Sequence, residues 1–301
     1  MRRASWLARS VAVAVALVVG LAGASCSSSE PPIAAEPAGE LLLHRGTTRQ
    51  PPELLVHDLS SGDERVISAA PAATGRWSSD GERVVFAVDA GDGNVEIQIV
   101  PAAGGAPVLV SAPGAESVPA WSPDCTRIAF ARFDLDNERS DIWVIDADGT
   151  NRRQVTTGTG FDTGIDWAPD GDTLAIMSDR GGDAEIVLVD VDGNAERQLT
   201  DNTVGDTWPR WSPDGSEIAF ARRVNERKQI FVMDASGENE VQLTTGTRGG
   251  EFPVWSADGE WIAYEQAGVA ITIMRADGTD RRELEVRGVP TDWGPKTGSC
   301  S

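Results

Sequence analysis

One tryptophan-centred phrase recurs along the chain at an almost constant spacing. A tryptophan, two small or turn-forming residues, an aspartate and usually a glycine make up five full copies, which begin at Trp77, Trp121, Trp167, Trp211 and Trp255. Each copy continues into a short apolar stretch. These tryptophans lie 44, 46, 44 and 44 residues apart, and a sixth, Trp293, follows after 38. A period near 40 residues with several short strands per unit is typical of a β-propeller.

The sixth copy breaks off after Trp293, and the part that it lacks is found at the other end of the chain. The segment 39–44 aligns with 259–264, and the apolar stretches that follow it match later strands of a repeat. Closing a ring in this way removes free sheet edges. The sequence therefore predicts an all-β fold over residues 39–299. We expect a six-bladed β-propeller of four-stranded antiparallel blades, with the last blade closed by both termini.

The repeats resemble the WD-repeat-like propeller repeats of the TolB family. Trp211–Gly215, Ile218–Phe220, a Val-Met-Asp strand end and an Arg-Gln-Leu-Thr strand carry the likeness. The resemblance spans residues 39–299 and implies the fold, but binding proteins, peptidase accessory domains and some lyases share it. TolB relatives grip an envelope lipoprotein, which implies an envelope protein or peptide as partner. The family has an α/β domain ahead of the propeller, where we expect only a thirteen-residue linker here, so the roles of that domain are not carried over.

The N-terminal segment is typical of a secretory signal. Three arginines precede an apolar run over 11–22, which is too short to span a bilayer. The stretch 22–26 resembles a bacterial lipobox, whose cysteine is lipidated after cleavage; the alternative is an ordinary signal peptide cleaved nearby. We expect a signal peptide over 1–25, lipidation of Cys26 and a flexible tether over 26–38. The protein would then be exported and lipid-anchored at the periplasmic or extracytoplasmic face of the cell membrane.

The net charge of the chain limits the classes of partner that it can bind. The sequence has 47 acidic and 26 basic residues, a net charge of −21, and removal of residues 1–25, which hold three arginines and no acid, leaves −24. Such a surface repels nucleic acids and anionic lipid headgroups. We expect no nucleic-acid partner, membrane contact through the lipid alone, and a monomer.

Two cysteines remain besides Cys26. Cys125 stands where four of the five full repeats carry glycine, and Cys300 lies near the C-terminus. Both fall at the face of the first-to-second-strand turns, where they could pair in an oxidising compartment and lock the closing blade. Their blades are not adjacent, so two unrelated thiols are the alternative.

Four acidic residues hold a fixed place in the repeat. Glu116, Asp162 and Asp206 each stand five residues before a repeat tryptophan, and Glu251 stands four before. In a propeller this loop lies at the mouth of the central channel. Converging carboxylates there would attract cationic peptides, as a partner, or metal ions; the alternative is that acids are scattered throughout so acidic a chain.

Calcium is the one cofactor that the sequence suggests. A second-to-third-strand loop contains three carboxylates close together in the sequence, those of Asp134, Asp136 and Glu138. The alternative is a solvent-exposed run of charged residues, which is more common. The repeat tryptophans are expected to pack between blades, since each holds the same place in its repeat.

No catalytic motif is evident. The sequence lacks Gly-x-Ser-x-Gly, His-Glu-x-x-His, Cys-x-x-Cys and a phosphate-binding glycine loop. Its two histidines, His44 and His57, fall in predicted strands of the closing blade. We therefore expect no enzyme but a protein or peptide interaction platform at the bacterial cell envelope. A channel-site enzyme or carbohydrate-binding propeller is one alternative, and a regulatory or sensory envelope lipoprotein is another.

Overall fold

The computed structural model describes residues 36–294, apart from 48–49, 69–70, 92–93, 112–113, 135 and 267–269, together with Cys300. The chain divides into Met1–Glu36 and Pro37–Ser301, and every strand below belongs to the second unit. The expected signal peptide 1–25 and Cys26 lie outside the described residues, as does the tether before residue 36. Within the described part of the chain, no helix is long and apolar enough to cross a membrane.

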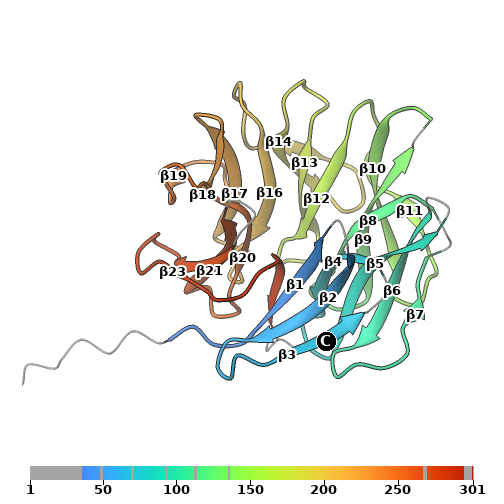
Figure 1. Ribbon diagram of the computed structural model, residues 1–301. Helices are drawn as coiled ribbons and strands as arrows, with labels where there is room; N and C mark the ends of the chain where they lie inside the picture. The colour runs from blue at the N-terminus through green and yellow to red at the C-terminus, as the bar shows by residue number, and fades with distance from the viewer. Residues whose placement is uncertain are drawn as a thin grey trace, which may run out of the picture. The chain divides into compact units, whose positions relative to one another are not determined.

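Six four-stranded antiparallel sheets make up the blades of a propeller ring (Figure 1). Blade 1 contains β4 (Ala72–Trp77), β5 (Arg83–Gly91), β6 (Asn94–Pro101) and β7 (Val108–Leu109). Blade 2 contains β8 (Glu116–Trp121), β9 (Arg127–Asp134), β10 (Arg139–Asp146) and β11 (Arg153–Gln154). Blade 3 contains β12 (Asp162–Trp167), β13 (Thr173–Ser178), β14 (Glu185–Asp190) and β15 (Glu196–Gln198).

The remaining blades follow the same order. Blade 4 contains β16 (Asp206–Trp211), β17 (Glu217–Val224), β18 (Arg227–Asp234) and β19 (Val241–Gln242). Blade 5 contains β20 (Glu251–Trp255), β21 (Trp261–Gln266), β22 (Ala270–Arg275) and β23 (Arg282–Glu283). The closing blade contains β24 (Val289–Gly294), β1 (Glu40–Thr47), β2 (Gln50–Asp58) and β3 (Glu64–Ser68).

The closing blade joins the two ends of the ring, as the sequence predicts. Its strand order is β24-β1-β2-β3, so the inner strand comes from the C-terminal side and the other three from the N-terminal side (Figure 1). In the antiparallel pairing of β1 with β24, Leu41 lies opposite Trp293 and His44 opposite Val289. This closure leaves no unpaired inner strand among the described residues.

The recurring Trp-x-x-Asp-Gly phrase forms the turn between the first and second strands. In blade 4, the Asp214 carboxylate accepts hydrogen bonds from the Ser212 hydroxyl (2.7 Å) and the Ser216 backbone N–H (3.0 Å). Gly215 then adopts a φ of +74°. Pro, Asp and Gly meet these demands because they respectively fix φ, bond the local backbone and tolerate positive φ.

The core lies between neighbouring blades, where apolar strand faces pack in separate clusters. The repeat tryptophans belong to these clusters, and some also bond the preceding blade. The Trp167 indole Nε1–H donates to the Ala120 carbonyl at 3.0 Å, and that of Trp255 to the Arg210 carbonyl at 3.0 Å. The expected inter-blade packing of the tryptophans is confirmed.

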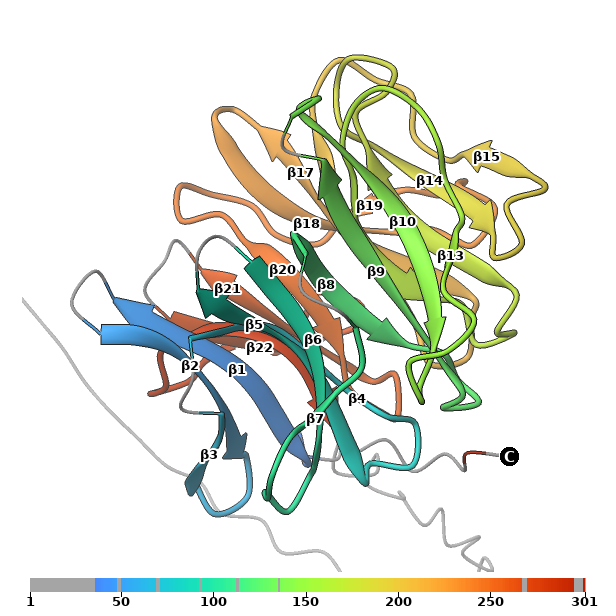
Figure 2. The same ribbon diagram turned by 90° about the vertical axis from the view of Figure 1, so that its right-hand side faces the viewer.

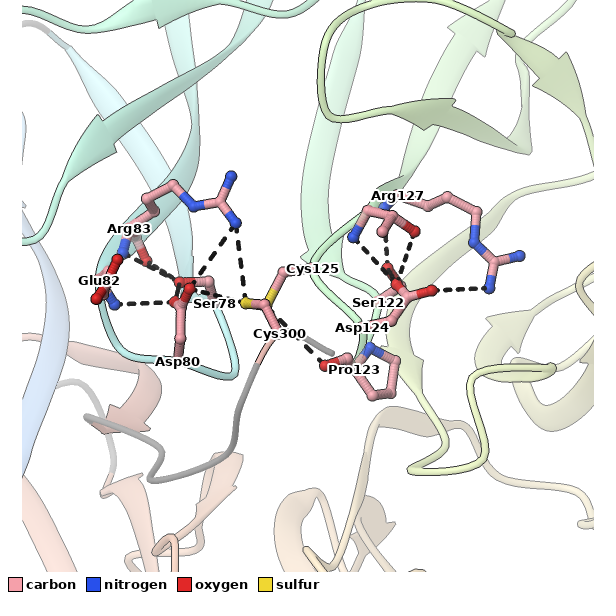
Figure 3. The surroundings of a disulfide bond; sticks show 11 residues. Ser78, Asp80, Glu82, Arg83, Ser122, Pro123, Asp124, Cys125, Arg127 and Cys300 are labelled. Carbon is pink, nitrogen blue, oxygen red and sulfur yellow. Dashed lines mark hydrogen bonds and ion pairs between the residues drawn. A yellow bond between two sulfur atoms is a disulfide. The ribbon is translucent and has the colours of Figure 1, made fainter.

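A disulfide joins Cys125 to Cys300, so the pairing that the sequence left open is present (Figure 3). The two Cα atoms are 5.3 Å apart. Cys125 adopts a φ of +58° at the turn position where other repeats carry glycine. The bond attaches the end of the chain to blade 2, with blade 1 standing between that blade and the closing one.

Candidate functional site

The four acids predicted at the channel mouth all begin an inner strand. Glu116, Asp162, Asp206 and Glu251 are the first residues of β8, β12, β16 and β20. Because the inner strands run in the same direction around the ring, the four lie at one end of the channel. Their placement follows the repeat, whereas their part in partner binding stays a prediction.

Asp206 is fully buried and held by a two-pronged ion pair. The Arg222 Nε and Nη2 atoms lie 2.7 Å from its two carboxylate oxygens, and the Asn202 amide donates a further bond at 2.9 Å. Arg222 also bonds Glu240. Burial lowers the pKa of the Arg222 guanidinium, but hydrogen bonds to Asp206 and Glu240 outweigh it, so the net pKa is raised. Such paired geometry fixes the mouth of blade 4.

Glu116 and Asp162 are also buried beside an arginine. The Glu116 carboxylate accepts from the Ser111 hydroxyl and from Arg152. Burial raises the pKa of Glu116, against the opposing effects of Ser111 and Arg152. In blade 3, the Arg180 Nε lies 3.1 Å from an Asp162 carboxylate oxygen. The charges of these acids are therefore compensated within the protein.

Glu251 differs because its side chain is 30% exposed, against 0% for Glu116 and Asp206. It bonds the Lys228 ammonium and accepts from the Trp208 indole N–H at 3.1 Å. The half-buried Trp208 and Phe252 rings lie 4.8 Å apart. Opposite Glu251 in the sheet is Glu265, where the matching strands of blades 2 and 4 carry arginine. Burial, and then the charge of Glu251, raise the pKa of Glu265.

Sequence reasoning missed this aromatic pair, although the repeat contains a signal for it. The third residue before each of the first five repeat tryptophans adopts a positive φ at a bulge in the inner strand: Thr74, Val118, Gly164, Trp208 and Phe252. The backbone shape recurs, so it belongs to the fold. The side chain at this position varies from none to indole, which makes the blade 4 and 5 side of the mouth aromatic.

Six residues hold one equivalent place in the inner strands of the six blades. The residue before each repeat tryptophan is, in blade order, Arg76, Ala120, Asp166, Arg210, Val254 and Asp292. Blades three apart thus carry the same kind of side chain. The Trp77 backbone N–H donates to Asp292 at 2.9 Å, and the Trp211 N–H donates to Asp166 at 2.8 Å. Burial lowers the pKa of Arg76, while Asp292 and Asp166 oppose that shift.

A cavity of about 310 Å³ lies at the tryptophan ends of the inner strands. Five repeat tryptophans line it, with Asp166, Arg210 and Asp292 at its polar side. Its described lining contains no histidine, cysteine or lysine, and it offers an aromatic wall, a guanidinium, carboxylates and serine hydroxyls.

The expected metal ligands do not come together. Asp134 accepts from the Asn137 amide at 2.8 Å and lies 3.4 Å from the Arg139 Nε. Among the described residues, the single group of three acidic, histidine or cysteine ligand atoms within 4.8 Å of one another is Asp80 with the disulfide sulfurs of Cys125 and Cys300. Calcium binding at Asp134, Asp136 and Glu138 stays a prediction.

The histidines lie in the closing blade, as expected. His44 is in β1 and His57 in β2. Burial lowers the pKa of His44, and the His57 Nδ1 lies 3.7 Å from Glu64. Neither is among the described residues that line the channel cavity.

The sequence profile of the TolB beta propeller domain matches residues 45–296. The chain belongs to this family. The Tol-Pal system protein TolB of Alcanivorax borkumensis is 38% identical to it over 64 residues, or 21% of this chain and 14% of that protein. An uncharacterized peptidase of Bacillus subtilis, YuxL, is 37% identical over 70 residues, or 22% and 11%. The matched regions are thus a small part of either relative.

Solved structures share the fold. TolB from Acinetobacter baumannii superposes with a TM-score of 0.73 at 21% identity, covering 85% of this chain and 66% of that one. A TolB-like protein from Agrobacterium tumefaciens gives 0.67 at 20%, covering 85% and 92%. An oligogalacturonate lyase in complex with manganese gives 0.57 at 16%, covering 83% and 74%. An enzyme and TolB proteins both share this fold, so the fold does not decide between catalysis and binding.

Proposed function

We propose that the protein is an exported β-propeller that serves as an interaction platform for a protein or peptide at the bacterial cell envelope. Its leader pattern over 1–25 and the lipobox-like Cys26 support export and lipid anchoring. Its membership of the TolB propeller family supports a protein partner. The strongly acidic composition favours a cationic partner and disfavours nucleic acid.

The observation that carries the proposal is the aromatic and charged cluster at the channel mouth. Trp208 and Phe252 are half-buried, in contact with each other, and next to the Glu251–Lys228 pair. Tryptophan and neighbouring charge, presented by a rigid scaffold, are typical of residues that dominate protein interfaces. We propose that Glu251 touches the partner, while the buried Glu116, Asp162 and Asp206 hold the mouth in shape for it.

Cross-linking in the native host tests this proposal. Trp208→Ala and Glu251→Gln should each reduce capture of the partner about tenfold or more, as expected for central interface residues. Glu226→Gln, an exposed acid in the β17–β18 turn, is the matched control and should capture normally. Undiminished capture by both mouth variants would refute the assigned surface. Cys26→Ala should release the protein from the membrane fraction. The identity of the captured partner then distinguishes an interaction platform from a regulatory or sensory lipoprotein.

A second candidate is the binding of a small molecule in the tryptophan cavity. Its volume of about 310 Å³ lies at the lower end of the range for small-molecule sites. Arg210 and Asp166 would supply the polar contacts. Tryptophan fluorescence measured during titration with oligosaccharides tests this second function. A saturable change in fluorescence that is lost in Arg210→Gln would favour small-molecule binding over the interaction platform.

A further inference from the structure

A second cavity, of about 540 Å³, lies at the junction of blades 1 and 2 and is separate from the channel cavity. Strands β9 and β10 supply most of its lining, which includes Asn94, Arg132, Arg139, Asp141, Trp143 and Gln154. These strands stand side by side in Figure 2. Polar groups predominate, so the cavity suits a ligand that can make hydrogen bonds.

Asp141 lies in this cavity, and its carboxylate has no partner among the described residues. The residue is only 6% exposed, yet its side chain has no hydrogen bond or ion pair with any residue that the structure describes. Burial raises the pKa of the Asp141 carboxyl, and Arg139 opposes this. The carboxylate faces the cavity without a protein donor, so a cationic donor that enters the cavity would form charge-assisted hydrogen bonds with it.

The repeat explains why Asp141 is unpaired. The equivalent residues of blades 3 and 4 are Glu185 and Gln229, which accept from the hydroxyls of Thr200 (2.6 Å) and Thr244 (2.8 Å). Thr156 takes the same place in blade 2, since its hydroxyl accepts from the Ile142 N–H just as those two threonines bond Ile186 and Ile230. Aspartate is one methylene shorter and makes no such bond.

The nearby arginines are engaged elsewhere. Arg132 lies opposite Asp141 in the sheet, but its guanidinium sits 5.4 Å from the Trp143 ring centroid. Arg139 donates to the Gly158 carbonyl at 3.1 Å and pairs with Asp134. The other charged groups around Asp141 are Asp134, Asp136, Asp162 and Arg180. Three carboxylates and two guanidiniums line the cavity, so it lacks one positive charge.

We propose that this cavity receives a lysine or arginine side chain of the partner, with Asp141 accepting its hydrogen bonds. The proposal rests on the interaction-platform function and adds a subsite to it. A cation supplies both the missing charge and the donors that the buried carboxylate lacks. The Asn94 and Gln154 amides and the Trp143 ring would contact the rest of the side chain. Calcium is disfavoured because the carboxylates do not converge and two guanidiniums share the cavity.

Calorimetric titration of the whole protein with short peptides tests the subsite. The probes are acetyl-Gly-Lys-Gly-amide, its Arg and Gln counterparts, and calcium chloride alone. The Lys or Arg peptide should bind at least about tenfold more tightly than the Gln peptide, and Asp141→Asn should remove that preference. Asp183→Asn, an exposed acid in the second-to-third-strand loop of blade 3, makes the same charge change outside the cavity and should bind normally.

A third variant distinguishes the effect of removing the negative charge from the effect of giving the carboxylate a partner within the protein. Asp141→Glu keeps the charge but has the length of Glu185, so it should accept from Thr156 and bind the cationic peptide more weakly than the natural protein. Equal binding of the Lys, Arg and Gln peptides, or an unchanged preference in Asp141→Asn, would overturn the proposal. Calcium binding that depends on Asp141 would reassign the cavity to a metal.

The two proposals can fail separately. If the peptides show no preference while partner capture still depends on Trp208, the subsite alone is wrong. If the Lys peptide binds through Asp141 but no partner is captured at the mouth, the interaction platform is wrong, and the cavity remains a cation-binding site that serves another function.

Discussion

Replacement of Cys300 with serine removes the disulfide to Cys125 and should lower the free energy of unfolding by several kcal/mol. The bond closes a loop of 175 residues. Loop-closure entropy for that length amounts to about 5 kcal/mol, and loss of a native disulfide commonly costs about 2–5 kcal/mol. We expect the lower part of that range, because compact unfolded chains lose less entropy on cross-linking.

The fold itself should survive this substitution. β24 remains hydrogen-bonded to β1, Trp293 is only 1% exposed, and its indole donates to the Ala38 carbonyl at 2.9 Å. Urea unfolding of the oxidised protein, the reduced protein and Cys300→Ser measures the effect. The last two should agree with each other and unfold at lower urea than the oxidised form.

Cys125→Gly is a second variant that removes the same disulfide. Cys125 adopts a φ of +58°, which glycine tolerates without strain and which four other repeats fill with glycine. It should therefore be destabilised slightly less than Cys300→Ser. A free energy of unfolding for Cys300→Ser within about 0.5 kcal/mol of the oxidised protein would refute the reasoning that the bond restrains the unfolded chain.

Three further outcomes are expected. Trp255→Phe removes the indole hydrogen bond to the Arg210 carbonyl, whereas the Trp211 indole N–H has no such bond among the described residues. In urea unfolding, Trp255→Phe should therefore lower the free energy of unfolding by about 1 kcal/mol more than Trp211→Phe does. Equal losses in the two variants would contradict this expectation. The raised pKa of Asp141 means that the folded state holds its proton to higher pH than the unfolded state, so this group costs stability as pH rises above the ordinary value of 3.8. Asp141→Asn should accordingly be the more stable protein at pH 7, with an advantage that vanishes below about pH 4 in pH-dependent thermal unfolding; a constant advantage would argue for another cause. Deletion of residues 289–301 should expose the edge of β1 and cause association in size-exclusion chromatography, and a monomer of unchanged heat resistance would show that the ring does not need β24.

The repeat made the fold predictable. Each tryptophan, turn and strand occurs several times, so local ambiguity in one copy is resolved by the others, and the match of 39–44 to 259–264 located the closing blade. The disulfide could be suggested but not decided, because the sequence places Cys125 and Cys300 at one face without giving their separation. Only the folded ring brings their Cα atoms to 5.3 Å.

The charge balance of the channel mouth was not predictable in this way. The acids occupy fixed repeat positions, but the cations that bond them do not all do so: Arg222 lies opposite Asp206 and 16 residues after it, whereas Lys228 lies 23 before Glu251 and Arg152 lies 36 after Glu116. With no constant offset, no pattern pairs them. The acids were therefore expected to present a bare negative charge, whereas each has a basic neighbour in the structure.

Asp141 shows where sequence and structure must be read together. Glu185 and Gln229 at its repeat position make the shorter residue visible in an alignment of the blades. The sequence alone does not show that a side chain shorter by one methylene loses its hydrogen bond. The threonine hydroxyl bonded to the longer side chains in blades 3 and 4 supplies the reason, because it shows what an acceptor must reach. In a repeat protein, the positions that depart from a satisfied pattern and leave a buried group unpaired are where a ligand has something to add, and Asp141→Glu measures that directly by restoring the pattern.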